Sequence, residues 1–80
     1  MTFKSIGEEI IQECVRASGR YPPFNSAHEG YAIILEELEE LKTEIFKKQS
    51  SHDMKRMRKE AIQVGAMALR FVNDIAPISL

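Results

Sequence analysis

The sequence predicts an all-α fold with three helices, the last two of which form a long antiparallel hairpin. The first observation behind this prediction is that apolar residues recur at spacings of three and four through most of the chain, as in amphipathic helices, while no segment alternates as a strand would. The second is that glycines, prolines and short polar runs divide the chain into three segments. Eighty residues are enough for a single domain, spanning residues 1–80.

The first helix is expected near the N-terminus. Ser5 and Glu8 have the spacing of a capping box, and Gly19 is a plausible end. Cys14 lies on the apolar stripe, so we interpret it as a small packed side chain rather than a reactive thiol. The apolar residues of this stripe are Phe3, Ile6, Ile10 and Cys14.

A loop follows over residues 19–26, because Pro22-Pro23 excludes a helix interior. Tyr21 and Phe24 are expected to pin this loop onto the body of the protein.

The second helix is predicted to begin at Ser26, which has Glu29 at capping-box spacing, and to continue to about Gln49. Its main apolar stripe is wide, and we expect this stripe to face the core. The stripe consists of Tyr31, Ile34, Leu35, Leu38, Leu41, Ile45 and Phe46.

The third helix is predicted to follow a polar turn at residues 49–53, capped by Ser51 or Asp53. It should run to about Ile75, because Pro77 prevents much continuation. Two long helices joined by a short turn form an antiparallel hairpin. The apolar stripe of this helix consists of Met57, Ala61, Val64, Ala68, Val72 and Ile75. Gly65, Ala66 and Ala68 are small enough for another helix to approach closely.

The two long helices carry more apolar stripe than one short helix can cover. A second hairpin would complete a four-helix core, so we expect a homodimer or homotetramer. Self-association is also expected because a chain this small, with one cysteine and no structural zinc motif, has a marginal core of its own.

Composition narrows the classes of function. The net charge is −1, which gives no general drive toward a nucleic-acid polymer or an anionic membrane. The first residues lack the apolar region of a signal peptide, and no apolar run is long enough for a membrane helix. With a single thiol, which suits a reducing compartment, we expect a cytoplasmic protein.

Acidic side chains form a second pattern. Glu37 and Glu40 share one stripe of the second helix, while Glu60 and Gln63 share a stripe of the third. Folding the hairpin near residue 51 brings these stripes opposite each other. Crowded carboxylates raise one another's pKa values, and Mg²⁺, which prefers oxygen ligands, would relieve their repulsion. The pattern therefore indicates a site for Mg²⁺ or Mn²⁺, although a Glu-rich helix can also be simply solvated.

These residues resemble a known family. The segment Glu37-Leu38-Glu39-Glu40-Leu41, followed by Glu60-Ala61-Ile62-Gln63, resembles the Glu-x-x-Glu … Glu-x-x-Asp signature of the MazG-like all-α nucleotide pyrophosphohydrolases. The resemblance covers about residues 28–75 and is greatest to short, phage-encoded members. It implies Mg²⁺-dependent hydrolysis of a nucleoside triphosphate between the α- and β-phosphates, and assembly of paired hairpins into dimers or tetramers.

Carried over by position, Glu37, Glu40 and Glu60 match the catalytic, metal-binding acids of the family. Gln63 stands where the family usually has Asp; its amide oxygen can coordinate a metal but carries no charge. Two hypotheses follow: a working pyrophosphohydrolase, or an inactive helical oligomer that serves as a binding or structural module.

Other polar residues have weaker patterns. Basic residues crowd the hairpin turn, either as a solvated end or as candidates to hold phosphates: Lys47, Lys48, Lys55, Arg56 and Lys59. His28 and His52 are expected at the surface, with His28 and Tyr31 as alternative contacts for a nucleotide base.

Overall fold

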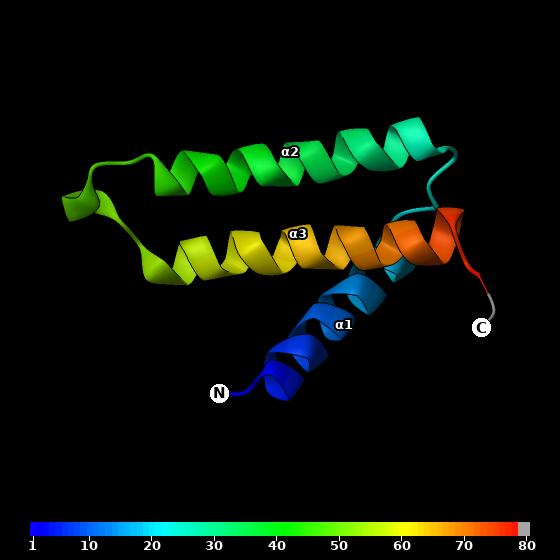
Figure 1. Ribbon diagram of the computed structural model, residues 1–80, viewed down its shortest axis with the longest axis horizontal. Coiled ribbons are helices and arrows are strands. Elements are labelled where there is room, and N and C mark those ends of the chain that lie inside the picture. Colours follow the sequence, from blue (N-terminus) through cyan, green and yellow to red (C-terminus); the bar gives the residue numbers. More distant parts are fainter. Residues whose placement is uncertain (79–80) are drawn as a thin grey trace.

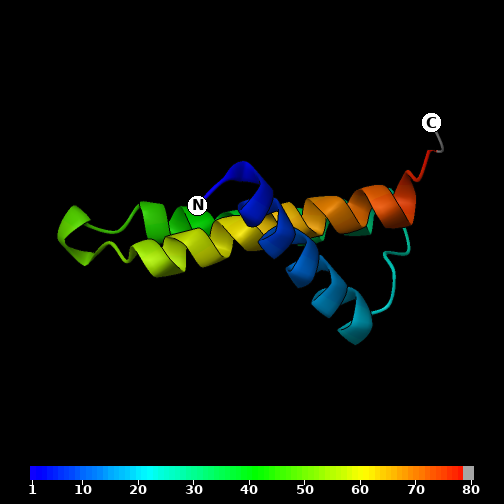
Figure 2. The ribbon, with the colours of Figure 1, turned by 90° about the horizontal axis from the view of Figure 1, so that it is seen from below.

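The computed structural model describes residues 1–78 and confirms the all-α fold. Its helices are α1 (Phe3–Arg20), α2 (Ala27–Ile45) and α3 (Met54–Ile75), with a short 3₁₀ helix, η1 (Gln49–Ser51), in the hairpin turn. Within residues 1–78 there is no β-strand. Helices α2 and α3 lie side by side and antiparallel, as Figure 1 shows. Helix α1 crosses α3 obliquely, and Figure 2 shows the crossing from below.

Helix α1 begins one turn earlier than the predicted capping box. Thr2 is its N-cap: the Ser5 N–H donates to Thr2 Oγ1 (3.1 Å), and the Thr2 N–H donates to Ser5 Oγ (2.9 Å). The prediction that Ser5 and Glu8 form the box is therefore wrong, because Thr2 supplies an equivalent hydroxyl upstream. The helix also passes Gly19 and ends at Arg20. Phe3, predicted on the packed stripe, is 96% exposed.

The loop between α1 and α2 is fastened at Phe24. This side chain is buried, and its backbone N–H donates to Asp74 Oδ2 of α3 (3.1 Å). Tyr21, by contrast, is 54% exposed, so the prediction that it also pins the loop is wrong. Tyr21 is the C-cap residue of α1, and its ring lies beside the Arg20 guanidinium rather than against the core.

The start of α2 agrees with the sequence pattern. Ser26 is the N-cap and its hydroxyl accepts the Glu29 N–H (3.1 Å). The Glu29 carboxylate does not complete the box; it accepts from the backbone and side-chain nitrogens of Asn25.

The hairpin turn is longer than predicted, because α2 ends at Ile45 rather than near Gln49. The His52 ring closes the turn, with Nε2 at 3.1 Å from the Ile45 carbonyl and 3.0 Å from the Lys47 carbonyl. These carbonyls lie at the end of a helix, where no intrahelical donor is available.

Asp53 then caps α3 by accepting the N–H groups of Lys55 and Arg56, as predicted. Helix α3 also ends at Ile75, as predicted.

The core is small. Its buried apolar residues are Ala17, Phe24, Ala66 and Met67. Partly buried side chains surround it, among them Cys14, which is a free thiol packed against this cluster. The other surrounding residues are Ile10, Ile33, Ile34, Phe71 and Ile75. The core therefore lies where α1 crosses the hairpin, rather than along the hairpin's main apolar stripes.

Those main stripes are largely uncovered in the single chain. The prediction that the wide stripe of α2 faces the core is wrong for most of its members, because α1 packs on α3 at a different face. We call the uncovered surface the open apolar face, and it consists of Tyr31, Leu35, Leu38, Ile45, Leu69 and Val72. Each of these side chains is between 38% and 64% exposed. On α2 this face points away from the acidic side, since Tyr31 lies about 180° around the helix from Glu40.

Two glycines allow the helices to approach closely. A Cβ atom at Gly30 would lie 2.5 Å from Phe71 Cδ2 and 3.1 Å from Phe24 Cδ2. A Cβ atom at Gly65 would lie 3.1 Å from Ile10 Cδ1 of α1. The expectation of a close helix contact at the small residues of α3 is therefore confirmed, and α1 is the helix that makes it.

We expect Gly30→Ala to destabilise the protein by about 1–2 kcal/mol, because the new methyl group overlaps the packed Phe71 ring. The matched control is Gly7→Ala in α1, where no atom lies within 4 Å of an added Cβ. There the better helix propensity of alanine should stabilise the protein by about 0.5–1 kcal/mol. Urea denaturation of both variants measures the difference. Equal shifts in the two variants would contradict the packing at Gly30.

Candidate metal centre

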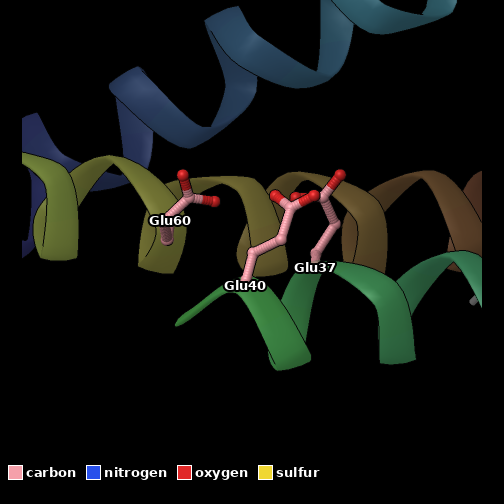
Figure 3. A group of neighbouring side chains, drawn as sticks. All are labelled: Glu37, Glu40 and Glu60. Atoms are coloured by element: carbon pink, nitrogen blue, oxygen red, sulfur yellow. The ribbon is translucent and has the colours of Figure 1, made fainter. Parts of the chain in front are cut away.

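The structure brings together three of the predicted acidic residues. Glu37 and Glu40 extend from α2, one turn apart, and Glu60 extends from α3 toward the same point, as Figure 3 shows. One carboxylate oxygen from each residue lies within 4.8 Å of the others. The hairpin register inferred from the sequence is thus confirmed for these three residues.

The three carboxylates repel one another. Partial burial, followed by the charge of Glu40 and a hydrogen bond with it, raises the pKa of Glu37 to about 7. Burial and the same neighbour also raise the pKa of Glu60. The cluster therefore holds more negative charge than the surrounding protein compensates.

The acids line one side of a cleft of about 560 Å³ between the three helices. This volume is within the range of small-molecule sites. Helix α1 supplies one wall, and the loop after it closes one end. The charged residues that line the cleft are Glu13, Arg16, Glu29, Glu36, Glu37, Glu40, Glu60 and Arg70, and the others are Ala17, Tyr21, Pro22, Phe24, Ile33, Gln63 and Met67.

Gln63 lines the same cleft, but its amide nitrogen donates to a carboxylate oxygen of Glu13 on α1. Glu13 is also held by Arg16, and its pKa is lowered, first by the hydrogen bond from Arg16. Sequence reasoning missed Glu13, Arg16 and Arg70 as members of the site. Arg70 shares a helical stripe of α3 with Glu60 and Gln63, so its spacing already indicates that it lies on their side of the helix. Glu13 and Arg16 reach the cleft because α1 crosses α3, which their spacing does not indicate.

The basic residues of the hairpin turn are absent from the described lining of the cleft. Lys47 donates to Glu44 (2.9 Å), and Arg56 lies 3.7 Å from the same carboxylate. Glu44 is 5% exposed, so these two cations compensate a buried acid at the far end of the hairpin. His28 and Tyr31 also lie outside the cleft lining; His28 is exposed, and Tyr31 belongs to the open apolar face.

The donor set fits a hard divalent cation. Three carboxylates, converging from two helices beside a cleft, supply oxygen ligands of the type that Mg²⁺ and Mn²⁺ take in proteins. Such sites use a few carboxylates and leave positions for substrate phosphate and water. Burial is the largest cause of the raised pKa values of Glu37 and Glu60, and the charge of Glu40 adds to both; a bound cation would offset this second contribution.

Comparisons with protein-family models, curated proteins and solved structures find no match for this chain. Among residues 1–78, no helix has both the length and the apolar character needed to cross a membrane.

The stability of the metal-free protein should depend on the protonation of Glu37. Its carboxyl pKa is about 7 in the folded protein against an ordinary value of 4.5, so the folded state binds this proton more tightly. The contribution of Glu37 to stability is therefore greatest below about pH 4.5 and is lost as pH rises through 7. Glu37→Gln should remove this loss. Relative to the parent, the free energy of unfolding of Glu37→Gln should increase by about 1 kcal/mol between about pH 4.5 and 7.5, after allowance for solvent screening.

Chemical denaturation at each pH, in EDTA, measures this difference between the two proteins. A constant difference across the range would contradict the raised pKa of Glu37.

Gln63→Asp should destabilise the metal-free protein by about 1–3 kcal/mol, because it removes the donor to Glu13 and adds a like charge. Gln63→Asn is the matched control, since it introduces a side chain of the same length as Asp but without charge. If the position faces a bound cation, Mg²⁺ should raise the melting temperature of the Asp variant more than that of the Asn variant. An equal response to Mg²⁺ would show that position 63 does not contact the ion.

Proposed function

We propose that the protein is a Mg²⁺-dependent nucleoside triphosphate pyrophosphohydrolase. The observation that supports this proposal is the convergence of Glu37, Glu40 and Glu60 at the edge of a cleft large enough for a nucleotide. The resemblance of the same residues to the MazG-like signature supports the same reaction. Mn²⁺ is an acceptable substitute for Mg²⁺, because it takes the same ligands.

In this proposal the three carboxylates hold the cation, and Gln63 keeps Glu13 at the opposite wall. Mg²⁺ held by these carboxylates would neutralise charge on the phosphates and would lower the pKa of a water molecule. The oxygen of a water molecule would bond to the α-phosphorus while the bond to the α,β-bridging oxygen breaks, and the proton lost by the water would pass to solvent. The products are a nucleoside monophosphate and pyrophosphate.

The test is pyrophosphate release from a panel of ribo- and deoxyribonucleoside triphosphates with Mg²⁺, Mn²⁺ or EDTA. We expect release that requires the metal, with the monophosphate as the other product. Release of inorganic phosphate alone would indicate a different bond cleavage, and no release from any substrate by the folded protein would overturn the proposal.

One observation favours a second candidate, an inactive helical module. Gln63 replaces the acid of the signature and is engaged by Glu13, so the cleft lacks a carboxylate at that position of α3. An inactive oligomer of this kind would bind a ligand or partner through the same surfaces without hydrolysing a nucleotide.

We also propose that the chain forms a homodimer in the cytoplasm through the open apolar face. Six large apolar side chains there remain more than a third exposed in the single chain. A second hairpin would cover them and produce a four-helix core, as paired helix hairpins do. The cleft and its carboxylates lie on the other side of α2 and would stay accessible.

A further inference from the structure

A second hollow adjoins the cleft, and we call it the α1–α3 groove. It has a volume of about 720 Å³ and is lined by the N-terminal parts of α1 and α3. The groove and the cleft share Glu13, Arg16 and Gln63 as lining residues, so the two hollows meet at these side chains. The other charged residues of the groove are Glu8, Glu9, Lys55, Arg58 and Lys59.

The groove and the cleft differ in charge. Four cationic side chains and three carboxylates line the groove, which gives a net charge of +1 when all of them are ionised. Two cationic side chains and six carboxylates line the cleft, which gives −4. A polyphosphate is therefore repelled less in the groove than in the cleft, and the difference remains after one Mg²⁺ is added to the carboxylates.

Two cations of the groove are already engaged by carboxylates. Arg58 Nη1 donates to Glu9 Oε1 (2.7 Å) and so joins α3 to α1, while Arg16 is held in the ion pair described above. Lys55 and Lys59 differ from these arginines, because both are exposed and neither forms an ion pair within residues 1–78. Their ammonium groups are therefore available to an anion in the groove.

Lys59 lies where the cleft leads into the groove. On α3 it is one turn before Gln63 on the same stripe, and Lys55 is one further turn, about 6 Å, along that stripe. The largest cause of the lowered pKa of Glu13 is the hydrogen bond from Arg16, and the charge of Lys59 also lowers it. The charge of Lys59 thus acts at the border that the two hollows share.

We propose that the α1–α3 groove binds the β- and γ-phosphates of the nucleoside triphosphate, with Lys59 and Lys55 as the cations that contact them. This inference rests on the proposed function and adds the direction in which the nucleotide lies. The α-phosphate would lie at the carboxylates of the metal centre, and the pyrophosphate group would point toward the start of α3. Lysine suits this role because its ammonium group binds phosphate as a compact point charge.

The opposite direction is disfavoured by charge. It would place the β- and γ-phosphates beside Glu29 and Glu36, which line the cleft on the N-terminal half of α2. The same end of the cleft also has Tyr21 and Pro22 in its lining, and these side chains suit a nucleoside better than a phosphate.

The experiment is calorimetric titration in Mg²⁺ with two sets of ligands. The first set is the α,β-methylene analogues of the four common ribonucleoside triphosphates, which resist cleavage at that bond, and the second is the four monophosphates. We expect Lys59→Gln to weaken binding of the triphosphate analogues about 10-fold, the loss of one charge-assisted contact, and to change monophosphate affinity by less than about 2-fold. Lys55→Gln should weaken analogue binding about 3-fold, because Lys55 is farther from the cleft.

Lys48→Gln is the matched control. Lys48 is an exposed lysine of the hairpin turn, outside the lining of both hollows, and the substitution removes the same charge. It should change analogue affinity by less than about 2-fold. All three lysines are exposed, so the variants should fold, and circular dichroism with melting temperature verifies this.

Parent-like affinity of Lys59→Gln for the triphosphate analogues would overturn the proposal. Equal losses for triphosphate analogues and monophosphates, equal losses in Lys59→Gln and Lys48→Gln, or no analogue binding by the parent would also overturn it.

Failure of the proposed function is distinguishable from failure of this subsite. If Lys59→Gln selectively loses the triphosphate analogues but the parent releases no pyrophosphate from any triphosphate, the subsite stands and the hydrolase activity does not. If the parent releases pyrophosphate and Lys59→Gln does so with the KM of the parent, the hydrolase activity stands and the subsite does not.

Discussion

Glu60→Gln should reduce pyrophosphate release at least about 100-fold while leaving the helices folded. The substitution keeps the size of the side chain and removes one of the three charges that would hold the cation. Even residues that only support a metal ligand typically cost about 10–100-fold when changed, so loss of a ligand should cost more. The metal-free variant should be more stable than the parent above neutral pH, because the Glu60 carboxylate is partly buried and crowded by Glu40.

Initial rates of pyrophosphate release, with Mg²⁺ varied at saturating nucleotide, measure the first effect, and the melting temperature in EDTA measures the second. Glu39→Gln is the matched control, because Glu39 is exposed on α2 and lies outside the cleft lining. A Glu60→Gln variant with parent-like activity would remove Glu60 from the catalytic site. Equal losses in both variants would point to a general charge effect.

Leu38→Glu should abolish self-association and leave a monomer of about the chain mass, 9.1 kDa. Leu38 is 46% exposed in the single chain, so a charged side chain there can remain in water and the helices should stay folded. In a dimer through the open apolar face, two such charges would be buried without partners, at a cost of several kcal/mol for each ion. Light scattering across a range of micromolar concentrations measures the mass.

The control for this experiment is Gln12→Glu, which adds the same charge at an exposed position of α1. It should leave the oligomeric mass unchanged. A parent protein that is already monomeric at these concentrations would show that the open apolar face does not mediate a homodimer.

The N-terminal caps of α2 and α3 were predictable because their signal is local, whereas the cap of α1 was assigned one turn too late. Ser26 and Asp53 cap their helices as their sequence positions indicate, because a side-chain oxygen needs only the next turn of backbone to accept from. The end of α2 was not predictable, since it depends on the His52 ring, which reaches back to carbonyls five and seven residues earlier.

The candidate site was predictable in part for the same reason. Glu37, Glu40 and Glu60 converge because their positions follow from helical spacing and one hairpin turn. Arg70 also follows from helical spacing, because it shares a stripe of α3 with Glu60. Glu13 joins them only through the angle at which α1 crosses α3. Periodicity also ranked the stripes of α2 by their apolar content, but it cannot say which stripe will face the cleft. The smaller mixed stripe, with Ile33 and Glu37, is the one near the cleft.

The packing of α1 links ligand affinity to local unfolding. Within residues 1–78, α1 makes its helix contacts with α3, and α2 makes its own with α3 from another side. Detachment of α1 would leave the contacts between α2 and α3 in place, and amide exchange would detect such a sub-global opening. Detachment would remove the wall formed by Glu13, Arg16 and Ala17. Apparent affinity is the intrinsic affinity multiplied by the fraction of molecules in the closed state. The contact of Ile10 with Gly65, outside the cleft lining, would thus help set how tightly the cleft holds the proposed nucleotide.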